Sequence, residues 1–369
     1  MKIGIDARDI QNGVYNGTGR YLANFINEFM RSDHEDTYVL FSEFPILTYK
    51  DSRIKNVIIK PAHTFIWDQF HLCSRLGKEK IDLFFSPYYK IPLFAPCKII
   101  STILDLTYQV FPYYKNRMSI FDKLYYLTFG TFCVWRANHI LTCSEHSKKD
   151  ICRLYSVFPS KISVIPLSLS PIYRYESDPA KLAQVREQFN AKDGYILYMG
   201  NFKPHKNVAT LIEAFMLVAE QFSKLKLVLV GPKTHQYEML ENLAEELQIS
   251  DKVEFVGTIF ENNDPHLIYS AAEMMVIPSC YEGFGLPLIE AMACHTPIAA
   301  SNYSSIPEVL KKAGLLVPPQ DVQGFTDAML QILSDKDLRS QLVQEGLKNL
   351  DGYDSKTIFN QMYTLFNKK

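Results

Sequence analysis

Short apolar segments alternate with helical patterns along the whole chain, and this alternation constrains the fold more than any other feature. Several of the apolar runs end at glycine or proline, and segments such as 207–222 follow them, where Leu211, Phe215 and Val218 recur on one helical face. The pattern is typical of βα units on a parallel sheet. The candidate strands are residues 2–5, 38–41, 56–59, 82–85, 98–103, 139–143, 162–165, 195–200, 226–231, 253–257, 274–278, 297–300 and 315–317. We therefore expect an α/β fold of doubly wound parallel sheets.

The length of the chain indicates two domains. A single core rarely grows beyond about 250–300 residues, and this chain has 369. The proline- and serine-rich segment 166–179 marks the boundary, which predicts an N-terminal domain of residues 1–170 and a C-terminal domain of residues 171–369. The last helical pattern, 355–366, can pack against either domain, including back on the N-terminal one. Open α/β sheets bind ligands beyond the carboxyl ends of their strands, so we expect the active site in a cleft between facing domains.

Charge and cysteine content exclude several classes of protein. The 39 lysines and arginines are balanced by 40 aspartates and glutamates, which excludes a generally basic nucleic-acid-binding protein. The seven cysteines include no C-x-x-C pair, so neither a zinc ribbon nor a disulfide framework is indicated. Charged residues occupy the N-terminus where a signal peptide needs an apolar run, and no segment reaches the roughly 18–20 uncharged apolar residues of a spanning helix. We therefore expect a cytoplasmic protein.

The most informative segment is 278–293, where a strand ends, a tight turn follows and a helix begins. Gly283 and Gly285 shape the turn, and Pro287 is tolerated in the first turn of the helix. A helix start of this kind presents amide N–H groups and partial positive charge to a phosphate. Glu282 before the turn and Glu290 within the helix can accept hydrogen bonds from vicinal sugar hydroxyls. Strand–glycine–helix turns also occur in many α/β proteins without a ligand, and from the turn alone both interpretations stay open.

The same segment reads E-G-F-G-L-P-L-I-E over residues 282–290, and in this it resembles the E-x7-E motif of a known family. The family is that of the retaining nucleotide-sugar glycosyltransferases of the GT-B fold, in the large bacterial group 1 (family 4) that includes mannosyl-, glucosyl- and rhamnosyltransferases. The resemblance implies two Rossmann-like domains that face each other across a cleft. Further segments that are similar to the family are residues 4–8, 17–21, 67–69, 82–87, 144–147, 199–207 and 301–317.

The resemblance also implies roles for individual residues. Glu290 would bind the ribose of the donor, and Glu282 would contact the transferred sugar. The donor diphosphate would lie against the backbone of Gly283, Phe284, Gly285 and Leu286. Lys206 would neutralise the diphosphate as the glycosidic bond breaks, a task for which a fixed cation and helix-end amides suffice, so the expected site holds no metal ion and no cofactor. The D-x-D triplet at Asp335 is predicted to cap a helix instead.

Two positions depart from the family pattern. Asn201 stands where the family usually has an arginine that binds the diphosphate, and Lys203 is the nearest cation that could substitute for it. Leu104 stands where the family usually has a histidine near the sugar. Asp105 follows directly, and it is predicted either to bind a sugar hydroxyl as part of the catalytic site or to cap the following turn.

Two further segments suggest contacts with the acceptor side. Gly17 and Gly19, followed by Arg20 near the start of a helix, are expected to let the acceptor or the diphosphate approach the backbone, or to form a loop without a ligand. The segment 108–135 interleaves aromatic and basic residues, which predicts either peripheral contact with the inner face of an anionic membrane or an ordinary buried helix.

The sequence therefore predicts a metal-independent, retaining hexosyltransferase of surface-polysaccharide and lipopolysaccharide biosynthesis. Similarity to the branch with G-T-G-R-Y and P-H-K-N implies mannose from GDP-mannose as the first choice of donor, and a saccharide or lipid-linked saccharide as the acceptor. A glycoside hydrolase that uses Glu282 and Glu290 is the less favoured enzyme, because hydrolases place two carboxylates on opposite sides of the bond. Leu104 and Asn201 motivate the other alternative, a non-catalytic protein that binds sugar nucleotides.

Overall fold

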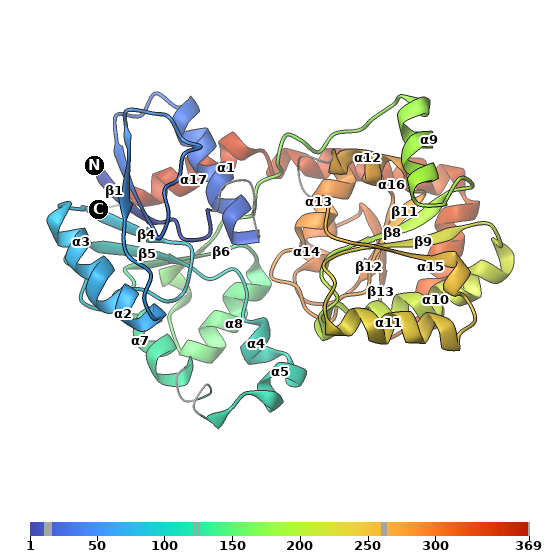
Figure 1. The fold of residues 1–369 in the computed structure, drawn as a ribbon, viewed down its shortest axis with the longest axis horizontal. Helices are drawn as coiled ribbons and strands as arrows, with labels where there is room; N and C mark the ends of the chain where they lie inside the picture. Colours follow the sequence, from blue (N-terminus) through green and yellow to red (C-terminus); the bar gives the residue numbers. More distant parts are fainter. Residues whose placement is uncertain (11–16, 121–122, 124–125, 260–263, 368–369) are drawn as a thin grey trace. The chain divides into compact units, whose positions relative to one another are not determined.

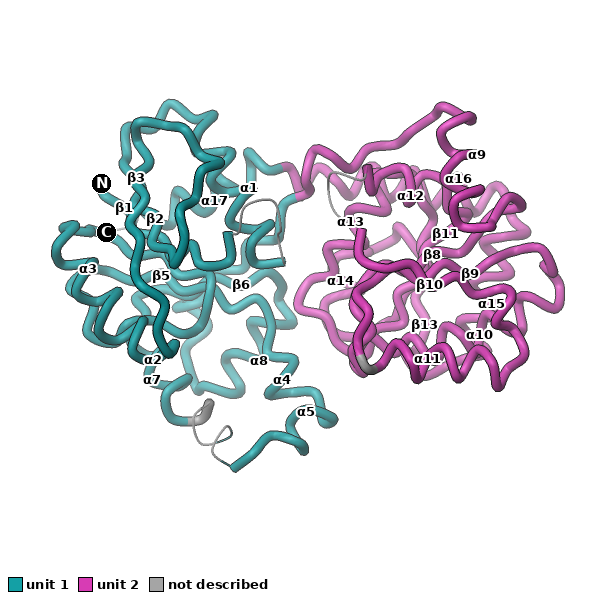
Figure 2. The backbone as a smooth tube through the Cα atoms, viewed as in Figure 1, with its two compact units in different colours: residues 1–168, 355–369 teal, residues 169–354 magenta. Residues whose placement is uncertain are grey.

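The computed structural model describes residues 1–10, 17–120, 123, 126–259 and 264–367. The chain divides into two compact units, one formed by residues 1–168 with 355–369 and the other by residues 169–354 (Figure 2). The chain therefore leaves the first unit after Ser168 and returns to it at Ser355.

Unit 1 is built on a seven-stranded sheet in the order β3-β2-β1-β4-β5-β6-β7, and the neighbouring strands run parallel (Figure 1). Its strands are β1 (Lys2–Asp6), β2 (Thr37–Ser42), β3 (Ile54–Ile58), β4 (Leu83–Ser86), β5 (Lys98–Thr102), β6 (His139–Thr142) and β7 (Ile162–Val164). Its helices are α1 (Gly17–Arg31), α2 (Thr64–Ile66), α3 (Cys73–Lys78), α4 (Thr107–Val110), α5 (Pro112–Arg117), α7 (Thr131–Arg136), α8 (Glu145–Tyr155) and α17 (Ser355–Phe366), with π-helical turns at Trp67–Leu72 and Tyr126–Gly130.

The last helix of the chain, α17, packs against α1 within unit 1. Phe25 of α1 places its ring 5.2 Å from that of Phe359 and 5.6 Å from that of Phe366, measured between ring centroids. Aromatic pairs at this separation add to the stability that their buried area already provides. The C-terminal helix thus completes the apolar layer on the α1 face of the sheet.

Unit 2 has a six-stranded parallel sheet in the order β10-β9-β8-β11-β12-β13. Its strands are β8 (Tyr195–Met199), β9 (Lys226–Val230), β10 (Val253–Val256), β11 (Met274–Ile277), β12 (Ile298–Ser301) and β13 (Gly314–Val317). Its helices are α9 (Pro179–Gln188), α10 (Val208–Gln221), α11 (His235–Glu246), α12 (Pro265–Ala271), α13 (Leu286–Ala293), α14 (Ile306–Leu310), α15 (Val322–Ser334) and α16 (Lys336–Asn349). The predicted inner face of α10, formed by Leu211, Phe215 and Val218, is fully buried.

The predicted doubly wound α/β fold is confirmed, because each predicted strand overlaps an observed one and both sheets reverse their strand order at one point. The reversal lies between β1 and β4 in unit 1 and between β8 and β11 in unit 2. Loops that leave the carboxyl ends of such strand pairs diverge and create the usual binding position of this fold. Asp335 caps α16 by accepting the Leu338 N–H at 2.9 Å, as the sequence predicts.

In the described part of the chain, no helix is both long enough and apolar enough to cross a membrane.

Gly231, which follows β9, offers a test of how closely the segments after β8 and β9 approach each other. A Cβ atom there would lie 2.0 Å from the carbonyl oxygen of Gly200, so Gly231→Ala must push apart the segments that follow β8 and β9. We expect a loss of about 1–3 kcal/mol in the free energy of unfolding, measured by urea denaturation.

Gly257 is the matched control, since it follows β10 and a Cβ there meets nothing within 4 Å. We expect Gly257→Ala to change the free energy of unfolding by less than about 0.5 kcal/mol. Equal losses in the two variants would contradict the close approach of Gly200 and Gly231.

Candidate active site

The candidate site of unit 2 lies on the two segments that follow β8 and β11, at the reversal of the sheet. These strands are hydrogen-bonded neighbours, with Met275 paired with Leu197. After β8 the chain runs into a 3-10 turn at Pro204–Lys206, and after β11 it forms the loop 278–285 that leads into α13. Because both segments leave the same edge of the sheet, residues far apart in sequence meet there.

Lys206 and Glu282 form an ion pair across the two segments. The Lys206 Nζ lies 2.6 Å from Oε1 of Glu282, and Ser279 donates its hydroxyl to the same oxygen at 2.8 Å. The two charged side chains are only 16% and 13% exposed. The structure thus brings together two of the residues that the sequence predicts as catalytic, 76 positions apart.

Hydrogen bonds to main-chain carbonyls fix the segment that carries Lys206. Asn207 adopts a left-handed conformation with φ of 55°, which asparagine tolerates better than most residues. Its side-chain amide donates to the carbonyl of Pro278 at 3.1 Å, and the Cys280 N–H donates to the carbonyl of His205 at 2.7 Å. The two segments are therefore tied together directly on both sides of Lys206.

Two serines that follow β12 hold the Glu282 turn, and the sequence analysis assigned no role to either of them. The Ser304 hydroxyl accepts the Glu282 N–H at 2.8 Å and donates to the Glu282 carbonyl at 2.9 Å. The Ser305 hydroxyl lies 3.0 Å from the Glu282 carbonyl and 3.1 Å from that of Phe284. Both serines belong to the segment 301–317 that resembles the family, and this was the only signal available in the sequence.

The predicted turn and helix start are present. Gly285 has a φ of 94°, a conformation that glycine adopts without strain, and α13 begins at the next residue with Leu286. Gly283 and Phe284 are buried beneath this turn. The first turn of a helix leaves amide N–H groups without intrahelical acceptors, which makes it suitable for an anion.

Glu290 lies further along α13, and a tyrosine that the sequence analysis missed holds its carboxylate. The Tyr269 hydroxyl, on α12, donates to Oε2 of Glu290 at 2.6 Å, and both side chains are buried. Burial, reinforced by the neighbouring Glu290 charge, raises the pKa of Tyr269 well above its usual value, so this hydroxyl stays a donor. No spacing rule links residues on α12 and α13, which explains why the sequence did not reveal the pair.

The remaining candidates of unit 2, Asn201 and Lys203, precede Lys206 in the segment after β8. The Asn201 side chain accepts the Lys203 N–H at 3.2 Å, and the Tyr198 hydroxyl donates to the Asn201 carbonyl at 2.6 Å, so Asn201 stabilises a local turn. Burial, together with the charge of Lys206, lowers the pKa of His205 to about 4. This imidazole is therefore neutral near pH 7, and it adds no charge beside Lys206.

The candidates of unit 1 lie after β5 and at the start of α1. Asp105 is exposed, and its Oδ1 accepts the Thr107 N–H at 3.1 Å, so the capping interaction that the sequence allowed is present. Leu104 is half-buried, and its carbonyl accepts the Ser147 hydroxyl at 3.2 Å. Helix α1 begins at Gly17, earlier than the sequence predicts, so Gly17, Gly19 and Arg20 belong to its first turn and not to a loop. The residues just before it, 11–16, lie outside the described part of the chain.

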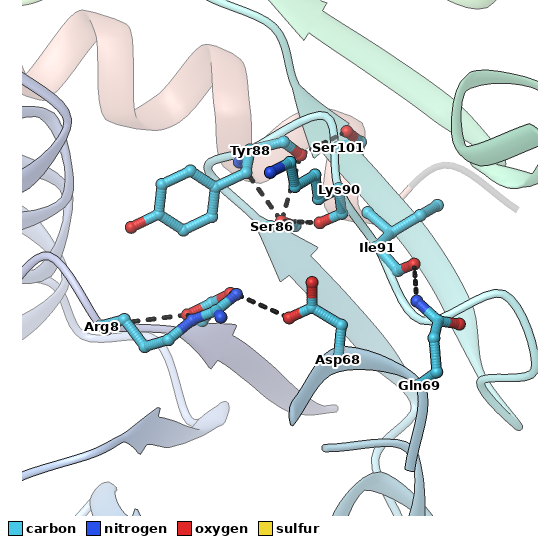
Figure 3. A network of polar contacts seen from close by, with 9 residues as sticks. Arg8, Asp68, Gln69, Ser86, Tyr88, Lys90, Ile91 and Ser101 are labelled. Carbon is cyan, nitrogen blue, oxygen red and sulfur yellow. Dashed lines mark hydrogen bonds and ion pairs between the residues drawn. The ribbon is translucent and has the colours of Figure 1, made fainter. Parts of the chain in front are cut away.

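A second charged network lies at the reversal of the unit 1 sheet. Arg8, just after β1, contacts Asp6 at 2.6 Å and Asp68 at 2.8 Å, and its guanidinium lies 3.9 Å from the centre of the Trp67 ring. Figure 3 shows Arg8 pointing toward Asp68, with Tyr88 on the segment that follows β4. Burial outweighs the nearby Arg8 charge and raises the pKa of Asp68 to about 6. The family-like segments 4–8 and 67–69 contain these residues, but their contact was not predicted.

Comparisons with known proteins cover both units. Residues 181–349 match the family Glycosyl transferases group 1, and residues 15–169 match Glycosyltransferase Family 4. The O-antigen chain mannosyltransferase B of Escherichia coli is 33% identical over 254 residues, which are 68% of this chain and 65% of the relative. The O-antigen chain mannosyltransferase RfbU of Salmonella typhimurium is 31% identical over 266 residues, or 72% of this chain and 68% of the relative. The chain thus spans about two thirds of the length of these two relatives.

Solved structures show the same fold at low sequence identity. Sucrose-phosphate synthase from Thermosynechococcus elongatus superposes with a TM-score of 0.80 at 21% identity, over 99% of this chain and 98% of the other. WaaG, described as a glycosyltransferase involved in lipopolysaccharide biosynthesis, has a TM-score of 0.76 at 16% identity over the full length of both chains. The fold is therefore GT-B. Together with the family matches, this shows that the chain belongs to the group 1, family 4 glycosyltransferases.

Proposed function

We propose that this chain is a retaining, metal-independent hexosyltransferase that uses a nucleoside-diphosphate sugar. The observation that carries the proposal is the Lys206–Glu282 pair, 2.6 Å apart, beside the start of α13. Departure of a nucleoside diphosphate develops negative charge, and preorganised donors in a partly buried site stabilise such charge strongly. Lys206 and the amides of the Gly285 turn are the groups proposed to do so.

In the proposed complex, the turn before α13 and the helix itself bind different parts of the donor. The diphosphate contacts Lys206 and the backbone of the turn from Gly283 to Leu286. The Glu290 carboxylate accepts hydrogen bonds from the ribose hydroxyls, with Tyr269 holding its other oxygen. Glu282 exchanges part of its contact with Lys206 for the hydroxyls of the transferred sugar. Lys203 supplies the second cation near the phosphates, where Asn201 provides only a neutral side chain.

Mannose from GDP-mannose is the donor that we propose first. Two similar proteins, from Escherichia coli and Salmonella typhimurium, are O-antigen mannosyltransferases. A structure of Anabaena Alr3699/HepE in complex with UDP and glucose has a TM-score of 0.78 to this chain, at 15% identity and 99% coverage of both chains, and supports a nucleoside-diphosphate sugar as the donor class. The proposed acceptor is a saccharide or lipid-linked saccharide of a surface polysaccharide, used in the cytoplasm.

Retention requires no protein base in the proposed mechanism, because the leaving phosphate takes the proton of the acceptor hydroxyl on the same face of the sugar. Asp105 then serves as a ligand of a sugar hydroxyl. Its carboxylate accepts the Thr107 N–H and keeps further acceptor capacity, and its exposure leaves it accessible. Gly17, Gly19 and Arg20 are proposed to contact the acceptor from the first turn of α1.

The hydrolase alternative finds little support in the geometry. Hydrolases separate their two carboxylates by about 5–10 Å across the scissile bond, whereas Glu282 and Glu290 belong to one turn and the helix that follows it. The non-catalytic alternative differs from the proposal only in that no sugar is transferred to an acceptor. The transfer assay described below distinguishes the two.

The donor site is tested by thermal unfolding with a panel of nucleoside diphosphates and their sugars. One nucleotide at about 100 times its Kd should stabilise the wild type by about 2.7 kcal/mol and raise its Tm accordingly. Lys206→Met and Glu290→Gln should each lose most of that rise. The first removes a diphosphate cation, and the second replaces a charged acceptor oxygen for the ribose by an NH2 donor.

Lys224→Met is the matched control, since Lys224 is 78% exposed in unit 2 and away from the candidate residues in sequence. Lys224→Met should show the same rise in Tm with the nucleotide as the wild type. If Lys206→Met and Glu290→Gln responded to the nucleotide as the wild type does, the donor would bind elsewhere.

The role of Tyr269 is tested by Tyr269→Phe, which removes one hydroxyl and leaves Glu290 without its buried donor. We expect the free energy of unfolding to fall by about 1–3 kcal/mol and the Kd of the nucleoside diphosphate to rise several-fold, measured by calorimetry.

Tyr195→Phe separates these two effects. Tyr195 is equally buried, and its hydroxyl donates to the Ile268 carbonyl on the same helix, α12, but not to Glu290. The Tyr195→Phe variant should lose a similar amount of the free energy of unfolding, but its Kd for the nucleoside diphosphate should stay that of the wild type. A rise in Kd in both variants would show that Tyr269 acts only through the stability of the fold.

Stereochemistry and metal dependence are tested in a transfer assay with GDP-mannose and a saccharide acceptor. The anomeric configuration of the product, read from the NMR coupling of the new linkage, should match that of the donor, and the rate should persist in excess EDTA. An inverted product would rule out the retaining mechanism, and an EDTA-sensitive rate would rule out metal independence. Nucleotide binding without any transfer, tested across acceptors, would favour the non-catalytic alternative.

A further inference from the structure

The two segments by which the chain enters and leaves unit 2 each carry a tyrosine that packs on the candidate donor site. The chain enters this unit at Leu169 and leaves it after Asp354 (Figure 2). We call residues 169–178, which precede α9, the entry segment, and residues 350–354, which follow α16, the exit segment. The Leu169 N–H donates to the carbonyl of Tyr353 at 2.9 Å, so the two segments are hydrogen-bonded to each other.

Tyr173 of the entry segment packs against the tyrosine that holds Glu290. Its ring lies 5.7 Å from that of Tyr269, measured between centroids, with the two planes at 81°. Tyr173 is 6% exposed and Tyr269 is completely buried. An edge-to-face arrangement of this kind is favourable for two aromatic rings. Because the Tyr269 hydroxyl donates to Glu290 at 2.6 Å, the Tyr173 ring restrains the side chain that orients this carboxylate.

Further contacts attach the entry segment to α12 and to the end of α13. The Glu176 N–H donates to the hydroxyl of Ser270, on α12, at 3.2 Å. The Tyr175 ring stacks on that of His295, which follows α13, with centroids 4.3 Å apart and 3° between the planes. The entry segment is therefore attached to both helices that meet at the buried tyrosine–carboxylate hydrogen bond.

Tyr353 of the exit segment packs against the glycine-rich turn. Its ring lies 5.7 Å from that of Phe284, with the planes at 79°, and both residues are buried. The Tyr353 hydroxyl donates to the carbonyl of Val309 at 3.3 Å, and the Asn349 amide donates to the same carbonyl at 2.7 Å. Phe284 stands between the two glycines of the turn, so its ring is the side chain by which packing can restrain their backbone.

The two tyrosines thus support the two parts of the candidate donor site separately. Tyr173 acts on the carboxylate proposed for the ribose, and Tyr353 acts on the turn whose amides are proposed for the diphosphate. A binding group must be held within about 0.5 Å of its productive position by side chains that packing keeps in place. We propose that Tyr173 and Tyr353 are positioning residues, which hold Glu290 and the Phe284 turn in the conformation that binds a nucleoside diphosphate. This inference rests on the proposed function, because it concerns the same donor site.

The first test is the Kd of the full chain for GDP and for UDP, measured by calorimetry. Tyr173→Leu and Tyr353→Leu should each raise the Kd of the nucleotide that binds about two- to tenfold, which is an aromatic edge contact expressed as an equilibrium constant. Tyr173→Phe and Tyr353→Phe keep the rings, so they should retain most of the wild-type affinity.

Phe189→Leu is the matched control. Phe189 is 8% exposed, and its ring meets that of Tyr195 at 5.8 Å and 87°, which is nearly the same geometry, but neither residue is a candidate of the donor site. This variant should lose a comparable part of the free energy of unfolding and keep the wild-type Kd. An equal rise in Kd in Phe189→Leu would show that the tyrosines act only through the stability of the unit.

A double-mutant cycle tests the route by which Tyr173 acts. If it acts through Glu290, Tyr173→Leu should raise the Kd no further in a Glu290→Gln background. Tyr353→Leu should still raise it there, because this tyrosine supports the turn. Additive effects of Tyr173→Leu and Glu290→Gln would overturn the role given to Tyr173.

The last measurement needs no nucleotide and separates this inference from the proposed function. Amide hydrogen exchange over residues 282–293, followed by mass spectrometry, should be faster in Tyr173→Leu and Tyr353→Leu than in the wild type and in Phe189→Leu. If the wild type bound neither nucleotide, the proposed function would fail, and the exchange rates alone would decide whether the tyrosines position this segment. Wild-type exchange in both leucine variants would overturn the proposal.

Discussion

The ion pair between Lys206 and Glu282 connects the two segments on which the candidate donor site is built. Removing two charged groups from water costs several kcal/mol each, roughly as much as their attraction returns, so such a pair adds little net stability. The Asn207 side-chain amide, bonded to the Pro278 carbonyl, and the Cys280 N–H, bonded to the His205 carbonyl, are what keep the segments together. The pair is therefore better explained by the proposed function, in which donor groups replace its two charges as partners of each other.

The glycine-rich turn from Glu282 to Gly285 is held in one conformation by hydrogen bonds from outside the turn. Two glycines allow the backbone to turn sharply, but they also increase the freedom that folding must remove. Ser304 and Ser305 supply the missing restraint, because their hydroxyls bond the peptide groups on both sides of Gly283. Glu290 is restrained in the same manner by Tyr269. In both cases, neutral hydroxyl groups fix a part of the candidate site.

Unit 1 uses its reversal point differently. There, Arg8 is held by two carboxylates, Asp6 and Asp68, and by the face of Trp67, so its charge is satisfied within the unit. Next to this network, Trp67, Leu72 and Leu76 are buried in one apolar cluster. Both sheets therefore have one reversal of strand order, but the two units place different charged groups beside it.

The sequence by itself determined the alternation of strands and helices, the two parallel sheets, and the turn and helix that carry Glu282 and Glu290. These features depend on residues within one or two helical turns of each other, and periodicity, glycine and proline report such local geometry directly. The sequence did not reveal Tyr269 against Glu290, the serines beneath Glu282, or Arg8 between two aspartates. It also left open whether α17 would return to α1. Only the tertiary structure decided these contacts, because strand order sets which distant segments meet, and strand order leaves no local pattern in the chain.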